Sequence, residues 1–278
     1  MARAASSLGI LHFSFTVLSH WIGLNGRGMP PKPQNSKIKA ADFATLYEGF
    51  NAPVSRFDCG RKCAPLNDGE PVCCSTQNAV PVVHKVEFDL LKSRTDLWSK
   101  FKPYDYSTRQ IVAELTSDCM AIHCKGARHC ERDNRTIACR GFPFYPYLTR
   151  ERQFVGIGTY WVFEDRCWMM SNLEIVDAKF VREFIATYEA LFFKDNSEFE
   201  TYVDFSASAR RVYSRWKREI PLLGRKGELL IVAPSTGEIR PGRKKDFPKA
   251  APFTSEKEYR EAVKEAGGEV PKEGLRPT

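Results

Sequence analysis

Residues 119–144 read CMAIHCKGARHCERDNRTIACRGFPF, and this stretch holds four of the nine cysteines in the 278-residue chain. The other five are Cys59, Cys63, Cys73, Cys74 and Cys167, so no cysteine precedes residue 59 or follows residue 167. Cysteine used only as a small apolar residue would be scattered along the chain. Clustered thiols indicate one shared purpose, either metal binding or disulfide pairing.

Local chemistry favours metal over disulfides. Cys73 and Cys74 are adjacent, the number of cysteines is odd, and no convincing secretory signal precedes them, which fits poorly with a disulfide scaffold. Because positive charge lowers the pKa of a nearby thiol, we expect the neighbouring basic residues to favour the thiolate form; solvated surface charge is the alternative. These residues are Arg61, Lys62, Lys125, Arg128, Arg132, Arg135, Arg140 and Arg166.

The cysteine pattern resembles a known family. Residues Phe57, Cys59, Cys63, Cys73 and Cys74 are similar to a stretched form of the CxxxCxxCC signature of the YkgJ-type zinc- or iron-chelating cysteine-cluster family. In that family a later cysteine opens a Cys-Pro-Phe-Leu-like step, another cysteine follows, and an Arg-Pro-x-x-Cys-Arg-x-Phe-Pro element closes the site. The matching positions here are Cys119 with Ile122, then Cys130, then Arg135, Cys139, Arg140, Phe142, Pro143 and Phe144.

The resemblance spans roughly residues 55–150 and includes departures from the family pattern. Nine residues separate Cys63 from Cys73 where the signature has two, Thr136 replaces the proline, and Cys124 and Cys167 are additional. The resemblance implies a metal-binding module whose ligands converge in space. The ligands that it implies are Cys59, Cys63, Cys73, Cys74, Cys119, Cys130 and Cys139.

The spacing of the cysteines does not distinguish a zinc ion from an iron-sulfur cluster. Cys59 and Cys63 have the separation that lets a short knuckle present two sulfurs to one zinc ion. Adjacent residues such as Cys73 and Cys74 tend to point apart, which suggests a two-centre arrangement or one ligand beside one bystander. Two four-thiolate sites would leave one thiol over, and four thiolates suit an iron-sulfur cluster equally well. His84, His123 and His129 are candidate substitute ligands.

The hydrophobic pattern predicts the α+β class: an irregular metal-stabilised cysteine-rich module with short strands, packed on amphipathic helices. Short helices are expected at 40–50, 84–92 and 97–101, and strands at 80–83, 110–116, 154–163 and 228–232. Capping boxes at Ser171–Glu174 and Ser197–Glu200 predict two longer helices that form an antiparallel pair, and Ser255–Glu258 predicts a last helix. The cysteine segments 51–78 and 118–140 are expected to be loops that metal holds in place.

Composition divides the chain into three parts. Residues 1–36 are expected to be a disordered or mis-assigned N-terminal extension, because Leu8–Leu24 is too polar for a spanning helix and no clear cleavage site follows; a signal peptide and an anchor are the alternatives. Residues 37–222 are predicted to form the cysteine-cluster metal-binding domain with its helical pair. Residues 223–278 are predicted to be a small strand-helix C-terminal appendage.

The charge is basic, with 42 Lys and Arg against 34 Asp and Glu and a net charge of +8. A dense basic stretch runs from Arg210 to Lys226 and includes Tyr213 and Trp216. On a helix the aromatic residues would share one face, so the simpler interpretation is a buried face opposite a solvated basic face. The charge permits contact with nucleic acid without favouring it.

Signatures of common enzymes are missing from the sequence: there is no Walker loop, dinucleotide fingerprint, G-x-S-x-G elbow or H-E-x-x-H helix. We therefore expect a cytoplasmic metal-binding protein in which zinc or an iron-sulfur cluster has a structural, metal-handling or redox role. Its expected partners are the metal ion and a protein, without a membrane. Some relatives of the cysteine-cluster family are attached to protein-lysine methylation, which implies the alternative of an iron-sulfur-dependent enzyme that modifies a protein or nucleic acid.

Overall fold

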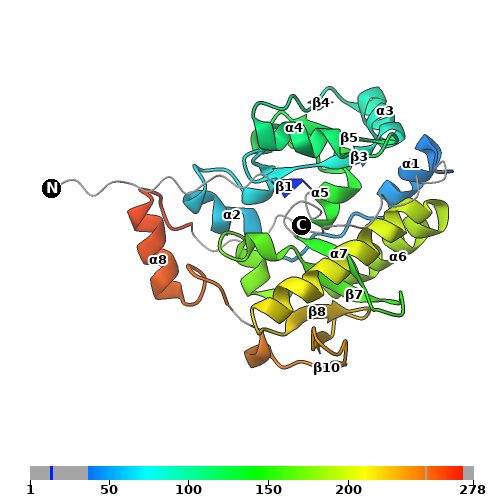
Figure 1. Cartoon of the computed structure of the whole chain (residues 1–278). Coiled ribbons are helices and arrows are strands. Elements are labelled where there is room, and N and C mark those ends of the chain that lie inside the picture. Colours follow the sequence, from blue (N-terminus) through cyan, green and yellow to red (C-terminus); the bar gives the residue numbers. More distant parts are fainter. Residues whose placement is uncertain (1–12, 15–36, 248, 272–278) are drawn as a thin grey trace.

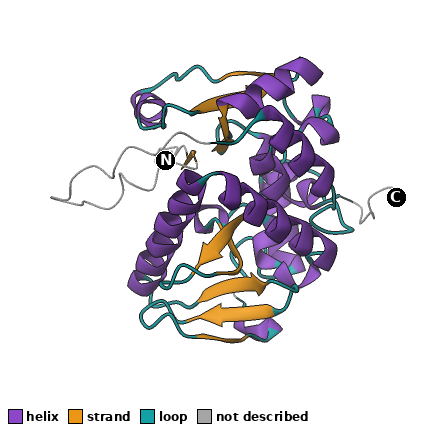
Figure 2. Cartoon of the chain, turned by 90° about the vertical axis from the view of Figure 1, so that its right-hand side faces the viewer, coloured by secondary structure: helices purple, strands orange, loops and turns teal. Residues whose placement is uncertain are grey.

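The structure is a computed structural model that describes residues 13–14, 37–247 and 249–271. Helices and sheets alternate along this part of the chain, which confirms the α+β class (Figure 1). The two larger sheets lie at opposite ends of the molecule with helices between them (Figure 2). The expected N-terminal extension lies outside the described residues, apart from β1 (Phe13–Ser14), which pairs in parallel with β2 (Ala79–Val80).

The largest sheet has the strand order β10-β9-β8-β7-β6, and its neighbouring strands are antiparallel. Branched and aromatic side chains favour such a pleated surface, and every residue of β6 and β8 is buried. The register places Phe144 opposite Thr159, and Ile220 opposite Val232. The strands are β6 (Phe144–Leu148), β7 (Phe154–Thr159), β8 (Ile220–Gly224), β9 (Leu229–Val232) and β10 (Ile239–Pro241).

Two predicted strands belong to this sheet. The strand expected at 154–163 is confirmed as β7, but it ends at Thr159, where a short 3-10 turn begins two residues later. The strand expected at 228–232 is confirmed as β9, which is hydrogen-bonded to β8 on one side and β10 on the other. This part of the C-terminal segment therefore continues the main sheet.

The second sheet has the order β3-β5-β4 and contains two of the cysteines at the ends of its central strand. Its strands are β3 (Val82–His84), β4 (Trp98–Lys100) and β5 (Cys119–Cys124). His84 faces Cys119 across the sheet, and Trp98 faces Cys124. Two predictions are wrong here. The expected helix at 97–101 is β4, and the part of the expected loop from Cys119 to Cys124 is a strand held by backbone hydrogen bonds.

The short helices include one in a segment whose residues favour a strand, because a side-chain cap begins a helix there. The strand predicted at 110–116 is wrong, because Asp105 caps a helix there: its carboxylate accepts the Thr108 amide at 2.7 Å. The helix predicted at 40–50 is confirmed, with Phe43, Leu46 and Tyr47 buried. The short helices are α1 (Ala40–Gly49), α2 (Cys59–Cys63), α3 (Lys85–Arg94), α4 (Tyr106–Ala113) and α5 (Ile137–Gly141).

The two long helices, α6 (Ala178–Lys194) and α7 (Asn196–Arg215), fold back on each other and cover the largest sheet (Figure 1). Phe192 contacts Phe199, and Tyr188 contacts Tyr202. Residues at similar distances on either side of the Asp195 turn therefore meet, as in an antiparallel pair. Both predicted capping boxes are wrong. Asp177 and Asp195 cap the helices instead, each carboxylate accepting the amide two residues ahead.

A last helix, α8 (Glu256–Glu265), begins where the sequence predicts, with the Ser255 hydroxyl accepting the Glu258 amide at 3.2 Å. Its buried side chains form a small apolar cluster of their own with Leu66 and Trp168 at the edge. The Tyr259 hydroxyl donates to the Lys62 carbonyl at 2.9 Å, so α8 packs beside α2. No helix within the described ranges is long and apolar enough to cross a membrane.

A buried arginine joins the short helices. Arg140, on α5, is 4 % exposed, and its guanidinium lies 4.6 Å from the centre of the Tyr47 ring. A buried cation is tolerated when its donors are used, and no carboxylate is needed because oxygens of the backbone surround it. The guanidinium donates to the carbonyls of Tyr47, Phe50, Asp133 and Arg135 and to the side-chain oxygen of Asn51.

We predict that Arg140→Lys lowers the free energy of unfolding by about 2–4 kcal/mol, because an ammonium group cannot reach all five oxygens and leaves buried acceptors without donors. Equilibrium unfolding in denaturant measures the change. Arg182→Lys, on the exposed face of α6, is the matched control and should change the value by less than about 0.5 kcal/mol. Equal effects of the two substitutions would contradict the conclusion that the hydrogen bonds of Arg140 hold these segments together.

Candidate metal centre

The first two cysteines lie one turn apart on α2. Asp58 caps this helix by accepting the Gly60 amide, which fixes where Cys59 leaves the loop. The Cys63 thiol is buried, donates to the Gly60 carbonyl at 3.5 Å and accepts the Val72 amide at the same distance. The contact with Val72 holds the next cysteine segment, a 3-10 turn at Val72–Cys74, against α2.

The adjacent cysteines of this turn, Cys73 and Cys74, have their thiols in contact. The two sulfurs lie 3.9 Å apart, and all nine cysteines of the structure are free thiols. A hydrogen bond between these thiols raises the pKa of Cys73 and lowers that of Cys74. The vicinal pair therefore holds one thiol whose proton is retained beside one that gives it up more easily.

Cys73 belongs to a group of thiols that lies at or beside α2. Burial raises the pKa of Cys167 first, and the thiols of Cys63 and Cys59 raise it further; the same two thiols act on Cys73. Cys167 precedes a 3-10 turn, Trp168–Ser171, that contacts α2. We refer to Cys59, Cys63, Cys73 and Cys167 as the α2 thiol group.

Cys74 belongs to a second group at the end of β5. Burial raises the pKa values of Cys124, Cys130 and Cys139, and the Cys74 thiol contributes to all three. The Cys124 sulfur also accepts the Gly126 amide at 3.4 Å. We refer to Cys74, Cys124, Cys130 and Cys139 as the β5 thiol group.

Local structure explains the sequence around Cys139. Thr136, which stands where the family resemblance has proline, caps α5 because its hydroxyl accepts the Cys139 amide at 3.0 Å. Gly141 allows α5 to approach α6, since a Cβ atom there would lie 2.9 Å from the Phe184 ring. The Cys-Arg-Gly sequence thus combines a thiol, the buried guanidinium and a close helix contact.

The expected preference for thiolates is wrong for most of these cysteines. Burial raises the pKa of Cys63 and of Cys139 to about 12, and at Cys139 it outweighs the opposing effect of Arg135. Arg135 is the cation that acts on Cys74, Cys130 and Cys139 in the expected direction. Without metal, the thiols are therefore largely neutral.

The two groups include six of the seven cysteines that the sequence predicts as ligands, together with Cys124 and Cys167. Among the described residues, however, no three His, Cys, Asp or Glu side chains are arranged to hold a metal ion. His123 interacts with the Ser99 hydroxyl at 3.1 Å, and His129 lies in a short 3-10 turn at Ala127–His129. The structure thus brings thiols into neighbouring groups without a preformed coordination geometry.

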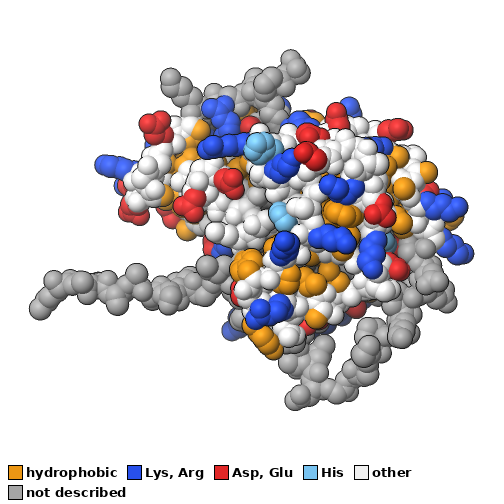
Figure 3. Space-filling model, turned by 90° about the horizontal axis from the view of Figure 1, so that it is seen from above, with side chains coloured by type: hydrophobic (Ala, Val, Ile, Leu, Met, Phe, Trp, Pro, Cys, Tyr) orange, Lys and Arg blue, Asp and Glu red, His pale blue; other side chains and the backbone are white. Residues whose placement is uncertain are grey.

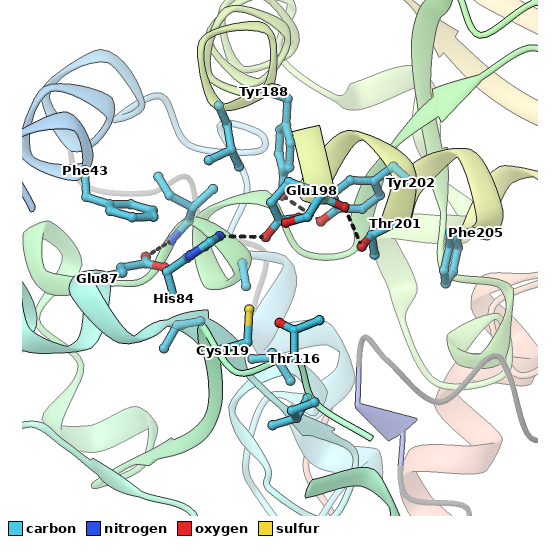
Figure 4. A pocket seen from close by; sticks show the side chains of 17 residues that line it. Phe43, His84, Glu87, Thr116, Cys119, Tyr188, Glu198, Thr201, Tyr202 and Phe205 are labelled. Atoms are coloured by element: carbon cyan, nitrogen blue, oxygen red, sulfur yellow. Dashed lines mark hydrogen bonds and ion pairs between the residues drawn. The ribbon is translucent and has the colours of Figure 1, made fainter. Parts of the chain in front are cut away.

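Cys119 lies elsewhere, in a cavity of about 90 Å³ between β3, β5 and α7 whose mainly apolar lining includes several polar side chains (Figure 4). Burial raises the pKa of its thiol to about 12, and the Glu198 carboxylate raises it next. His84 and Glu198 point toward each other across this cavity, with Thr116 and Cys119 below them in the view. Cys119 therefore shares its surroundings with carboxylates and an imidazole.

The cavity contains a buried ion-pair cluster that the sequence pattern did not reveal. His84 Nε2 lies 2.9 Å from the Asp195 carboxylate and 3.7 Å from that of Glu198. Burial opposes the charged imidazole, but Asp195 and Glu198 outweigh it and raise the pKa of His84. Burial raises the pKa of Glu198 to about 7. The only sequence signal was indirect: Asp195 precedes a polar helix start, where an acidic cap is common.

Comparisons of the chain with protein-family models, with curated proteins and with solved structures give no match. The resemblance to the YkgJ-type family consequently stays a prediction, and the site rests on the positions of its own residues.

We predict that Glu198 makes the protein less stable as the pH rises from about 4.5 to about 7. Its pKa is higher in the folded chain than its ordinary value of 4.5, so its protonated form stabilises the fold at low pH, and this contribution is lost as the pH passes the folded value. His84 acts in the same direction, because its pKa is also raised. In Glu198→Gln the fall should be smaller by about 1–3 kcal/mol.

Denaturant unfolding at a series of pH values between 4.5 and 7.5 measures this difference. Glu200→Gln is the matched control, because Glu200 is on the same helix but its pKa is lowered by Arg152 and it does not titrate in this range. Parallel pH profiles for the parent chain and Glu198→Gln would show that the carboxyl group has an ordinary pKa.

Proposed function

We propose that the protein binds metal through two sets of four cysteine thiolates, the α2 thiol group and the β5 thiol group, which meet at Cys73 and Cys74. The metal is zinc or an iron-sulfur cluster. One observation supports the proposal: eight free thiols from segments far apart in the sequence affect one another's pKa values, in two overlapping sets of four. Four thiolates are the donor set that both kinds of centre take.

The vicinal pair supports a division into two centres. The sulfurs of Cys73 and Cys74 are 3.9 Å apart. Cys59 and Cys63 raise the pKa of Cys73. Cys74 raises the pKa values of the other three thiols of the β5 thiol group and also that of Cys63, so it adjoins both groups. One short turn can therefore supply a ligand to each centre. Cys119 is left over, which matches an odd total of nine with two four-ligand sites.

Metal binding on these groups requires two changes in the chain. The ligands of one ion must come within roughly 4 Å of one another, given metal–sulfur bonds of about 2.3 Å, so the thiols move inward. Their protons must leave, which ties the affinity to pH. Arg135 offsets part of the negative charge of the β5 thiol group, and Arg61 and Lys62 lie between Cys59 and Cys63 in the other.

The role that follows is to join segments of the chain. The α2 thiol group links α2 to the Val72–Cys74 turn and to the turn after Cys167, whereas the β5 thiol group links that same turn to β5 and α5. Zinc in these positions would stabilise the fold. An iron-sulfur cluster would add the capacity to transfer electrons.

We predict that Cys139→Ser and Cys167→Ser each lower the metal content of the anaerobically purified protein by about half, since each removes one ligand from a different four-thiolate set. The double variant should hold almost none. Elemental analysis measures the metal, and absorbance at about 400 nm identifies thiolate-bound iron.

Cys119→Ser is the control, because this thiol lies in the His84 cavity. It should keep the metal content of the parent chain. A parent protein purified without oxygen that contains no metal would refute the proposal, and loss of metal in Cys119→Ser would refute the assignment of ligands to two groups.

A further inference from the structure

A groove of about 550 Å³ lies beside the C-terminal half of α7, and arginine side chains dominate its lining. Three segments form it: the turn after β6, α7 itself, and the turn between β9 and β10. No carboxylate lines it within the described part of the chain. The lining residues are Arg150, Ala207, Arg210, Arg211, Ser214, Arg215, Pro234 and Ser235.

Two of the arginines are fixed in place by oxygens of the backbone. Arg150 Nη2 donates to the Ser235 carbonyl at 2.6 Å and to the Pro234 carbonyl at 3.3 Å, which holds the two turns together. Arg210 is buried, and its Nη1 donates to the Leu148 carbonyl at 2.8 Å and to the Tyr147 hydroxyl at 3.2 Å. Both hydrogen bonds use Nη1, so the other nitrogens of this guanidinium have no acceptor among the described residues.

The other two arginines follow on α7, one and five residues after Arg210. Arg211 and Arg215 are four residues apart and therefore share one face of the helix. Arg211 donates to the Ser208 hydroxyl at 2.7 Å. Arg215 makes no hydrogen bond or ion pair with the described residues, and both side chains are exposed. The groove therefore has two rigid guanidinium groups and two that are free to adjust to a ligand.

The lack of counter-ions in this groove contrasts with the rest of the surface. Arg152, Arg218 and Arg225 are paired with Glu200, Glu164 and Glu189. The face shown in Figure 3 likewise has Lys and Arg interspersed with acidic and apolar side chains.

Two carboxylates act on the groove from outside its lining. Hydrogen bonds from its own backbone amide and from Thr149 lower the pKa of Glu151, and Arg150 and Arg210 lower it further. Burial raises the pKa of Asp204, and Arg211 acts against this rise. Four cations against these two carboxylates leave an excess of positive charge at the groove.

We propose that this groove binds phosphate groups, either of a small organic phosphate or of a phosphodiester backbone. The planar guanidinium fork matches two oxygens of a phosphate, and four such groups that converge without carboxylates offer more donors than the protein itself accepts. The volume lies in the range of about 300–1,000 Å³ that is typical of small-molecule sites. The groove shares no residue with the thiol groups, so this inference is independent of the proposed metal site.

The sequence predicts a solvated basic face for this stretch, and the ion pairs of Arg218 and Arg225 are consistent with that prediction. It could not show that Arg210 is buried, nor that Arg150 and Ser235, about sixty residues before and twenty-five after it, complete the same groove. A phosphate site differs from a solvated face in having fixed donors from several segments.

The test measures binding of inorganic pyrophosphate by calorimetry and of a single-stranded oligonucleotide by fluorescence anisotropy, with the full chain at low salt. Arg211→Gln combined with Arg215→Gln should weaken binding at least tenfold. The double variant Arg182→Gln with Lys226→Gln removes the same charge from exposed positions outside the lining and should change the affinity less than twofold. Thermal unfolding verifies that each variant is folded.

The two ligands distinguish the source of the phosphate. Pyrophosphate binding assigns the groove to compact phosphates, and binding of the oligonucleotide alone assigns it to a phosphodiester backbone. The proposal is overturned if the parent chain binds neither ligand, or if both double variants weaken binding equally, since the effect would then be one of net charge. Arg215→Gln alone, which removes no hydrogen bond of the fold, repeats the test if the double variant does not fold.

Discussion

The guanidinium of Arg140 is the interaction on which the cysteine-bearing half of the molecule depends. A charge in the interior is costly unless its donors are used, and here the acceptors are almost all backbone carbonyls from the end of α1 and from the loop before α5. These segments are held together because each of them supplies oxygens to the same guanidinium. Cys139 precedes Arg140 directly, so the position of one ligand candidate is fixed by its neighbour.

The thiols themselves are in an environment that opposes their ionisation. Burial raises the pKa of most of them, so the fold without metal contains neutral thiols held by weak N–H···S contacts such as those to Cys63 and Cys124. A metal ion would replace these weak contacts with short bonds and would supply the positive charge that the interior lacks. Part of the free energy of metal binding would then be offset by the cost of deprotonating the thiols and of bringing the segments together.

How far the sequence predicts this structure is clearest in β5. The clustering of cysteines, the helix with Phe43 and Leu46, the β9 strand and the cap at Ser255 follow from local patterns. Because residues 118–140 were predicted to be a loop, the geometry of β5 was not foreseen. Cys119 and Cys124 are five residues apart, and side chains at odd spacings in a strand point to opposite faces of the sheet. Cys124 thus joins the other thiols, while Cys119 faces His84. Caps on α4 and α7 were missed because one carboxylate decides where each helix begins.

Helix α7 explains how one chain accommodates an acidic cavity and an arginine groove. Its first turn carries Asp195 and Glu198 beside His84, where the amide end of the helix favours negative charge. Its last turns carry Arg211 and Arg215, where the carbonyl end favours positive charge. The amide end of the helix therefore offsets part of the cost of burying the ionised carboxylates, and the carbonyl end suits the arginines. Because α7 also packs on β6 and β8, the two polar sites stand at fixed positions on one rigid element, and the apolar middle of that element forms the core between them.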